Sequence, residues 1–587
     1  MNRARLHAFL SSRRATWILF VLILLLSLPA LSTGWQHDDY IHQRMLHGSP
    51  AAQRRSPDEL YCFAGGPHAR RSPVELPWWY SPTHRSCFFR PLSSVSLALD
   101  HTHLLRHPEL AHAHSLLWFL LICGALHGLA RRLLSPAQAN LALLIYGVSG
   151  FSVSGVAWLA ARHTVVSAAI AGWGLLAYVG GRSDGRPVRT LAGLLLLTLA
   201  LLAGESSLSA FAFVAAYELF LASDAPRRRL AHLAGATAIA GAYVLWYARA
   251  AYGTADLGLY LDPVRQTGPF LLALPGRLLA LWCDALLGIS STLWHFAAYK
   301  PLYLPWSVLS LGVLLGLLRL SPAVRSPQSQ KLLRFFGLGS LAAVLPMASA
   351  VLGGRLLIIP GIGLACFFAL LVWPGESPDA PPTPSSPRLF RVLLGITCGL
   401  LFLANPAMRL MQCSGMRQLS QIEDRISQSF LAPCDTADHY FLLGSDDFAV
   451  AMFAPYLLEE PLRRKHWQQI TLASSDIAIQ VLDEKTLRLR AQPPGLLLGG
   501  FVLDLTRPRS QPLQPGQRLP IRLGEVLVEE VSPRGVLSLQ LRLSVPYQDG
   551  SICWLRFDGE TVVPFSITDR NVSKTQIVPY SKSKLPF

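Results

Sequence analysis

Two adjacent carboxylates, Asp38 and Asp39, stand in the stretch Gly34-Trp35-Gln36-His37-Asp38-Asp39-Tyr40, directly after the first long apolar run. A carboxylate at a membrane boundary, beside aromatic side chains, is partly desolvated. Desolvation raises its pKa and suits it to accept a proton. Asp38 and Asp39 are therefore candidates for general acid–base chemistry. The alternative interpretation is an acidic pair in a solvated loop.

Four further ionisable residues border apolar runs: Arg90, Arg162, Glu205 and Arg355. The planar fork of a guanidinium matches a phosphate group, and ionisable residues at membrane depth are candidates for function. The arginines could instead extend their charged ends to water, and a tight surface turn would also accept Glu205.

A group of histidines could in principle bind a metal ion: His101, His103, His107, His112 and His114. Their spacing matches no standard zinc site, and histidines are common near interfaces. We therefore predict neither a metal site nor a cofactor from them.

The elements that must position these residues are membrane helices. Hydrophobic residues make up 51% of the 587 residues and charged residues only 15%, against roughly 25% charged in an average soluble protein. The net charge of +17 does not indicate nucleic-acid binding, because basic residues cluster between apolar runs as the positive-inside rule describes. The run from Trp17 to Leu31 could be a signal peptide, but it lacks a small-residue cleavage pattern and favours an uncleaved span.

The charge pattern predicts about eleven transmembrane helices within residues 1–405, with the N-terminus in the cytoplasm. The first outer loop covers residues 35–111. Residues 270–287 are apolar enough to span, but a span there would invert every later loop. We therefore expect a helix along the membrane surface. An odd number of spans places residues 406–587 outside the cytoplasm.

Residues 406–587 are predicted to form a small β-rich accessory domain, a sandwich or barrel. Short alternating runs separated by Pro, Gly and Asp indicate strands: residues 440–443, 469–472, 477–482, 487–490, 497–505, 526–531, 537–543 and 552–557. A helix capped near Ser445 and Asp446 follows the first strand.

Nine cysteines include no CxxC pair. Two disulfides are plausible if their regions face an oxidising compartment, one between Cys62 and Cys87 and one between Cys413 and Cys434. This scheme leaves Cys553 over.

Five pieces, read in order over residues 15–405, resemble the polytopic GT-C glycosyltransferases. The similarity is to the branch with protein O-mannosyltransferases and transmembrane-TPR O-mannosyltransferases, without the TPR repeats. The pieces are Asp38-Asp39 after the first span, Arg90-Pro91-Leu92 followed by His112 or His114, Val156-Ala157-Trp158 with Arg162, Gly204-Glu205, and the stretch from Arg355 to Gly363. The chain has Ser149-Gly150 in place of His-Pro and His163-Thr164 in place of Ala-Asp.

The resemblance implies transfer of a sugar from a polyprenyl-phosphate donor to a protein, lipid or glycan acceptor at the outer face. Asp38 would be the general base and Asp39 would orient it or the substrate. Arg90, Arg162 and Arg355 would bind the leaving phosphate. Glu205 and His112 would line the sugar or acceptor pocket.

The expected location is a bacterial inner membrane, with the lipid bilayer as a partner and no nucleic acid. Two alternatives stay open, a non-catalytic scaffold related to these enzymes and a lipid or glycan transporter. A transporter would be expected to show repeat symmetry or helices broken near the midplane.

Overall fold

The computed structural model describes residues 3–49, 51–66, 76–324, 326–373, 387–429, 434, 437–457, 465–508, 510–568 and 575–582. Contacts divide the chain into two compact units. The helical unit consists of residues 1–34, 89–250 and 261–417. The β-rich unit consists of residues 35–88, 251–260 and 418–587. The first outer loop therefore groups with the C-terminal segment, and each unit is described by itself.

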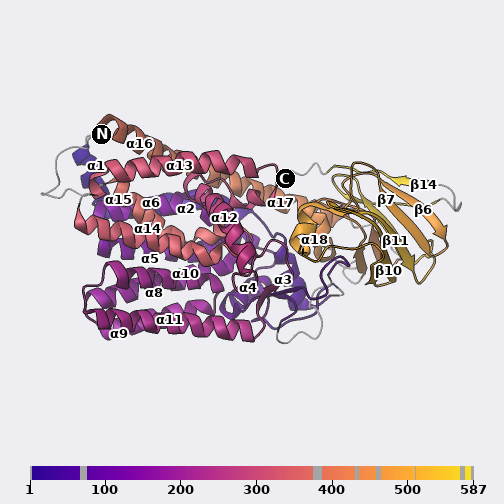
Figure 1. The fold of residues 1–587 in the computed structure, drawn as a ribbon, viewed down its shortest axis with the longest axis horizontal. Helices are drawn as coiled ribbons and strands as arrows, with labels where there is room; N and C mark the ends of the chain where they lie inside the picture. Colours follow the sequence, from indigo (N-terminus) through magenta and orange to yellow (C-terminus); the bar gives the residue numbers. More distant parts are fainter. Residues whose placement is uncertain are drawn as a thin grey trace. The chain divides into compact units, whose positions relative to one another are not determined.

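Long helices that run roughly side by side form the helical unit (Figure 1). They are α1 (Arg3–Leu10), α2 (Arg13–Ser27), α4 (Pro91–His103), α5 (Pro108–Leu133), α6 (Pro136–Val148), α7 (Val153–Ala157), α8 (His163–Ser183), α9 (Pro187–Leu201), α10 (Leu208–Phe220), α11 (Pro226–Arg249), α12 (Thr267–Leu287), α13 (Lys300–Leu320), α14 (Pro327–Met347), α15 (Pro360–Val372) and α16 (Pro387–Gly399), followed by α17 (Asn405–Ser429), which continues beyond residue 417. Proline begins many of them, as its fixed φ allows in a first helical turn.

Seven helices within the described residues are long and apolar enough to cross a membrane, or eight if the bent pair α6 and α7 is one span. The prediction of a mainly α, polytopic membrane protein with a β-rich C-terminal region is confirmed. Helices α9, α10, α14 and α15 coincide with predicted spans but are not among these candidates. The number of about eleven spans stays a prediction.

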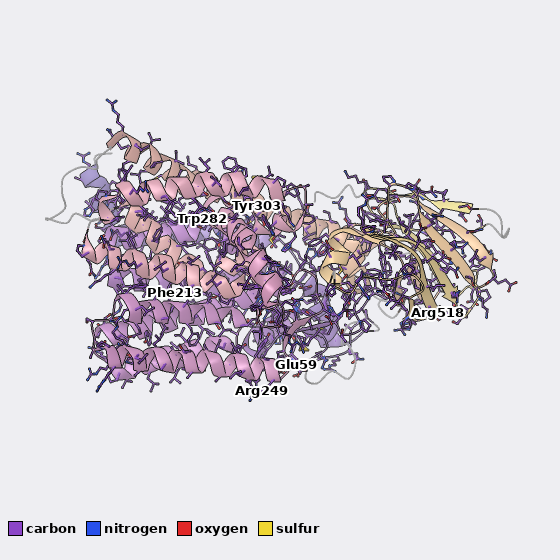
Figure 2. The ribbon with its side chains drawn as sticks, viewed as in Figure 1. Glu59, Phe213, Arg249, Trp282, Tyr303 and Arg518 are labelled. Atoms are coloured by element: carbon purple, nitrogen blue, oxygen red, sulfur yellow. A yellow bond between two sulfur atoms is a disulfide. The ribbon has the colours of Figure 1, made fainter. Side chains whose placement is uncertain are left out.

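Helix α12 covers the segment expected to lie along the membrane surface, and it runs obliquely across its neighbours in Figure 1. It is also long and apolar enough to span. Polar contacts tie α12 and the loop after it to α13. Trp282 Nε1 donates to Ser310 Oγ at 2.8 Å, and Tyr303 Oη donates to the Ser290 carbonyl at 2.6 Å. Trp282 and Tyr303 are labelled in Figure 2. The surface position of α12 stays a prediction.

Small residues allow α8 and α9 to approach closely. A Cβ atom on Gly181 would lie 2.4 Å from the Thr190 backbone nitrogen, and one on Gly193 would lie 2.4 Å from the Tyr178 backbone nitrogen. Close backbone packing of this kind is typical of helices in membranes, where apolar burial alone does not drive association.

Three sheets form the β-rich unit. The largest has the order β14-β6-β7-β11-β10-β9 with antiparallel pairs, a second has the order β13-β12-β4-β5, and a third has the order β1-β2-β3. The strands are β1 (Cys62–Ala64), β2 (Arg85–Cys87), β3 (Gly253–Ala255), β4 (His439–Leu442), β5 (His466–Gln469), β6 (Ile477–Asp483), β7 (Thr486–Ala491), β8 (Leu498–Gly499), β9 (Arg518–Ile521), β10 (Gly524–Ser532), β11 (Gly535–Leu543), β12 (Ile552–Phe557), β13 (Val562–Pro564) and β14 (Thr575–Val578), and the helices are α3 (Asp38–His47), α18 (Phe448–Leu457) and α19 (Gly500–Thr506).

A parallel β-α-β unit lies inside this mostly antiparallel region. Strand β4 leads into α18 and then into β5, and β4 pairs parallel with both β5 and β12. The Asp447 carboxylate accepts a hydrogen bond from the Val450 backbone N–H at 3.0 Å, so the cap lies one residue after the predicted pair. The crossover helix is the connection that parallel strands require.

The predicted strand over residues 497–505 is wrong. Strand β8 ends at Gly499, and helix α19 begins at Gly500. Gly500 has a φ of 72°, in the left-handed region that favours glycine, so the extended chain turns away there. The β-favouring apolar residues Phe501 and Val502 continue past the turn, and this is why the sequence predicts a strand there.

Two tryptophans of the first outer loop belong to the core of the β-rich unit. Trp78 and Trp79 are buried with residues of the C-terminal strands. Trp78 Nε1 donates to the Ile470 carbonyl at 3.1 Å, and Arg507 Nη1 donates to the Trp79 carbonyl at 2.8 Å. These contacts explain why the loop and the C-terminal segment form one unit.

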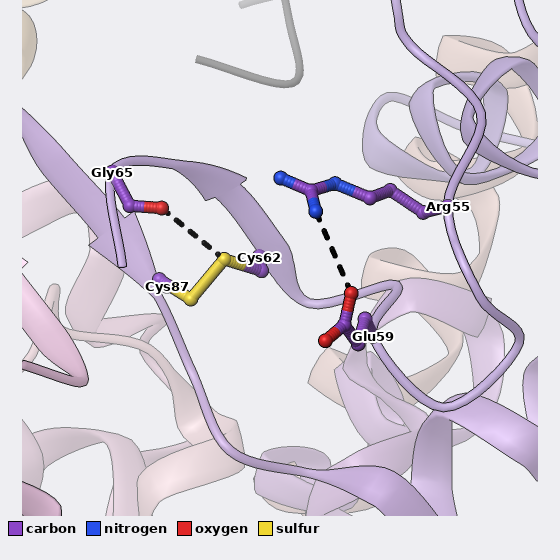
Figure 3. The surroundings of a disulfide bond; sticks show 5 residues. All are labelled: Arg55, Glu59, Cys62, Gly65 and Cys87. Carbon is purple, nitrogen blue, oxygen red and sulfur yellow. Dashed lines mark hydrogen bonds and ion pairs between the residues drawn. A yellow bond between two sulfur atoms is a disulfide. The ribbon is translucent and has the colours of Figure 1, made fainter. Parts of the chain in front are cut away.

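Two disulfides cross-link this unit. Cys62 and Cys87 are bonded as predicted, beside the Arg55–Glu59 ion pair (Figure 3). The second predicted pair is wrong, because Cys434 is bonded to Cys553 and Cys413 is a buried free thiol. Helix α17 continues from Cys413 to Ser429, a rise of roughly 24 Å, which the few residues before Cys434 cannot retrace.

Candidate functional site

The two adjacent carboxylates have different surroundings within the β-rich unit. Asp38 begins helix α3 and is partly exposed, whereas Asp39 is fully buried. Asp39 Oδ2 accepts a hydrogen bond from the Gln36 backbone N–H at 2.9 Å. The Asp39 carboxylate therefore orders the segment that leads into the helix, and Asp38 is the more accessible of the two.

His37, which precedes the pair, is held by a buried glutamate that the sequence analysis did not single out. The Glu423 carboxylate lies 2.6 Å from His37 Nδ1 and accepts the His37 backbone N–H at 3.0 Å. Burial by itself would lower the pKa of the imidazole. The Glu423 carboxylate and then the two aspartates after His37 raise it, and the net pKa lies above the ordinary 6.5. No local pattern indicates this partner, because it lies 386 residues away.

Arg90 and Glu205 meet in the helical unit. Arg90 Nε donates to Glu205 Oε2 at 2.9 Å, and Arg90 Nη2 donates to Glu205 Oε1 in a second bond. Arg90 is the residue before α4, and Glu205 follows α9. Their segments are tied by Ser93 Oγ, which donates to the Ala203 carbonyl at 2.6 Å. Two residues predicted to contact one substrate thus form a bidentate pair.

Arg162 is fully buried, and every nitrogen of its guanidinium has a partner. Nη2 lies 2.5 Å from Asp100 Oδ2 and donates to the Ala111 carbonyl at 2.7 Å. Nε donates to Ser115 Oγ at 2.8 Å, and Nη1 donates to the Ser96 carbonyl at 3.2 Å. These bonds join α4 and α5 to the turn before α8.

The Arg162 partner Asp100 was not among the predicted residues. It lies on α4 and also contacts His114 Nδ1 at 3.1 Å. An acidic residue within an apolar stretch is the signal that could have revealed it. The role of Arg162 at a phosphate stays a prediction.

His112 anchors the segment that leaves the first span. It is fully buried on α5, with Nε2 2.8 Å from the Gly34 carbonyl and Nδ1 3.0 Å from the Val156 carbonyl. Thr33 Oγ1 lies 3.2 Å from the same Nε2. His112 therefore fixes the point from which the chain runs on to the acidic pair.

Arg355 lies in the short helix Gly354–Leu357 before α15. Its guanidinium carbon is 5.7 Å from the ring centre of Trp158, and Nη2 donates to the Val351 carbonyl at 3.2 Å. A Cβ on Gly354 would lie 2.8 Å from Phe151 Cα. The close packing of Gly354 holds the arginine next to the Val156-Ala157-Trp158 segment.

Arg90 and Glu205, two of the predicted site residues, are in direct side-chain contact. Across the described residues, no three His, Cys, Asp or Glu side chains are grouped to hold a metal ion. His107 and His114 have carboxylate partners, Glu109 and Asp100 respectively.

No family model matches the chain, and no curated protein matches it. Four chains of solved structures match it, and two of them are structures of the same protein. The structure of ArnT from Cupriavidus metallidurans bound to undecaprenyl phosphate is 14% identical, with a TM-score of 0.37, and the match covers 78% of this chain and 90% of that one. ArnT in the apo state is 15% identical, with a TM-score of 0.38, and the match covers 78% and 86%. Such low values say nothing about which residues act.

Proposed function

We propose that the protein is a membrane glycosyltransferase that moves a sugar from a polyprenyl-phosphate donor to an acceptor at the outer face of the membrane. The main support is the pairing of Arg90 with Glu205. The two residues belong to different motif segments, 115 residues apart, and they form a bidentate ion pair. Such a meeting is expected if the motif segments build one site in the helical unit.

The proposed reaction assigns the proton to Asp38. The acceptor hydroxyl loses its proton to the Asp38 carboxylate, and the hydroxyl oxygen attacks the anomeric carbon of the sugar. The bond between that carbon and the phosphate oxygen breaks, and the polyprenyl phosphate leaves with the electron pair. A cation near the leaving oxygens lowers the barrier, because negative charge develops there.

The leaving phosphate is assigned to Arg355, whose position the resemblance implies. Its guanidinium carbon lies 5.7 Å from the ring centre of Trp158, and Nη2 donates to the Val351 carbonyl. Arg90 would share its charge between Glu205 and the donor. Arg162 would act indirectly, because its bonds join α4 and α5. His112 would set the start of the loop that carries Asp38.

The orientation is part of the proposal. The two disulfides of the β-rich unit favour an oxidising compartment for residues 35–88 and 418–587. Arg3, Arg5, Arg13 and Arg14 favour a cytoplasmic N-terminus. A bacterial inner membrane would satisfy both conditions.

A non-catalytic scaffold is the second candidate. The observation in its favour is that the guanidinium groups of Arg90 and Arg162 are bonded to carboxylates of the protein itself. Arginines already neutralised in this way have less charge to offer a donor phosphate.

The test compares the unaltered full-length protein with Asp38→Asn. Both are placed in lipid nanodiscs with a panel of polyprenyl-phosphate sugars labelled in the sugar, and sugar release is measured with and without candidate acceptors. Loss of a general base is expected to lower the rate by about 10²- to 10⁴-fold. The matched control is Glu530→Gln, because Glu530 forms an exposed pair with Arg490.

Equal rates for Asp38→Asn and the unaltered protein would refute the assignment of the base. If the unaltered protein releases no sugar from any donor in the panel, the scaffold is the better explanation.

A further inference from the structure

The residue before the acidic pair has a backbone conformation that is rare for a side chain of its kind. His37 has φ 48° and ψ −116°. These values are close to those of the first central residue of a type II′ turn, a position dominated by glycine. The Asp39 backbone N–H donates to the Gln36 carbonyl at 2.9 Å, which closes the turn. A non-glycine residue keeps this conformation only where its surroundings hold it.

Glu423 supplies the holding contact. Its carboxylate accepts the His37 backbone N–H at 3.0 and 3.3 Å, and Oε1 lies 2.6 Å from Nδ1 of the ring. The Glu423 side chain is 0% exposed and that of His37 is 14% exposed, so water competes little for these bonds. One carboxylate therefore fixes both the backbone and the ring of a single residue.

Helix α18 fixes the ring from another direction. The His37 ring stacks on Phe453 with centres 4.7 Å apart, and it meets Phe448 edge to face at 5.4 Å. Arg44, further along α3, donates through Nε to the Tyr456 carbonyl at 3.0 Å. The start of α3 is thus held by both α17 and α18.

The turn determines where Asp38 lies, because Asp38 is its second central residue and the first residue of α3. Asp39 is fixed by its own bond to the Gln36 backbone N–H. If the turn opened, the axis of the first helical turn and the direction of the Asp38 side chain would change together.

We propose that Glu423 is a positioning residue for Asp38. It does not touch the reacting groups. It holds His37 in the glycine-like turn conformation, and the turn aims the Asp38 carboxylate at the acceptor hydroxyl. The inference deepens the proposed function and rests on it, but the position of Asp38 can be measured without any activity.

The first experiment measures that position. Asp38→Cys is introduced into the full-length protein in nanodiscs, with and without Glu423→Gln, and the rate of labelling by a membrane-impermeant maleimide is measured. The free cysteines that the structure describes are buried or half-buried, so they should be labelled slowly. Their labelling is measured in the unaltered protein and subtracted from that of Asp38→Cys. A glutamine keeps the size of the side chain but loses the charge and one acceptor.

We expect Glu423→Gln to raise the labelling rate by about 5-fold or more, because a loosened turn exposes residue 38. The control is Arg425→Gln, a change at an exposed residue of the same helix whose Nε donates to the Gln421 carbonyl of its own helix. Equal labelling rates with and without Glu423→Gln would overturn the inference, whatever the enzyme assays give.

The second experiment asks whether the position matters for the reaction. Glu423→Gln is expected to lower kcat by about 10-fold or more and to change the donor KM by less than about 3-fold, because a misplaced base weakens the transition state and leaves donor binding intact. Adding His37→Gly to Glu423→Gln is expected to restore kcat to within about 3-fold of the unaltered protein, since glycine adopts the turn without support.

Failure of His37→Gly to restore kcat, in a double variant that keeps its thermal unfolding midpoint, would overturn the positioning role. The proposed function alone would fail if the unaltered protein released no sugar while Glu423→Gln still raised the labelling rate of Asp38→Cys. The two failures are therefore distinguishable.

Discussion

Asp100 Oδ2 lies 2.5 Å from Arg162 Nη2, in a pair whose side chains are 5% and 0% exposed. Removing one partner of a buried ion pair leaves an uncompensated charge and typically costs about 3–5 kcal/mol. We expect Asp100→Asn to lower the unfolding midpoint of the purified full-length protein strongly, measured by tryptophan fluorescence. Asp184→Asn is the control, because its partly exposed pairs with Arg132 and Arg189 should cost about 1 kcal/mol or less.

The same variant separates two roles for Arg162. A protein with Asp100→Asn that keeps its stability and binds the lipid donor more tightly would show that Arg162 serves the phosphate directly, because the change leaves more of its charge for the phosphate.

The pair of Arg90 and Glu205 predicts non-additive kinetics. Arg90→Gln and Glu205→Gln should each lower kcat/KM by about 10- to 100-fold, and the double variant should be little worse than the poorer single variant. The physical reason is that either change releases the other side chain from its fixed position. The measurement is a double-mutant cycle on sugar release, with the Arg132–Asp184 pair as a cycle expected to show no coupling. Fully additive losses would show that the two side chains act separately.

The raised pKa of His37 predicts how stability depends on pH. The charged groups that act on the ring are Glu423 from α17 and the two aspartates of α3, while Phe448 and Phe453 of α18 pack against it. A folded-state pKa above the unfolded 6.5 stabilises the protein fully below 6.5, and this contribution is lost as the pH rises through the folded value. The unfolding midpoint of His37→Gln should therefore fall further below that of the unaltered protein at about pH 6 than at about pH 9.

His84 provides a control of opposite sign. Burial lowers its pKa to about 4, against a smaller opposing effect of Asp256. Its neutral form favours the folded protein above 6.5, and stability is lost as the pH falls toward 4. His84→Gln should therefore lose less stability than the unaltered protein in that range. Parallel curves for both histidine variants would contradict the assigned charges.

The disulfide between Cys434 and Cys553 predicts a specific loss of stability. Its ring closes 119 residues, and removing such a bond typically costs about 2–5 kcal/mol. The variant Cys434→Ser/Cys553→Ser should lower the unfolding midpoint of the β-rich unit, measured by limited proteolysis over a temperature range. Cys413→Ser should change it little, because Cys413 is a free thiol. A linked peptide containing Cys413 in mass spectra without reductant would refute this pairing.

The sequence predicted the features that depend on long, repeated patterns. An apolar run such as that from Pro108 to Leu133 can cross a bilayer stably only as an α-helix, because every backbone group must be hydrogen-bonded within the segment. Alternation likewise predicted most of the C-terminal strands. The prediction failed at residues 497–505, where an apolar stretch turns at Gly500 and continues as a helix.

Contacts between distant segments could not be predicted from the sequence. His37 and Glu423 are separated by 386 residues, and neither is part of a pattern that points to the other. The membership of Trp78 and Trp79 in the C-terminal core was missed for the same reason. Asp100 could have been found, since it directly follows the mostly apolar run from Val95 to Leu99 and a buried carboxylate needs a partner.

The bond from Trp78 to the Ile470 carbonyl has a consequence for how the chain is made. The two residues are separated by 392 positions, and a ribosome adds roughly 5–20 residues per second. After the first loop emerges, its tryptophans therefore wait roughly 20–80 s for the strands that bury them. During synthesis the two tryptophans of this loop are exposed, and a chaperone outside the membrane could bind them before the C-terminal strands do. Truncated chains that end before Ile470 should be favoured targets for proteolytic quality control.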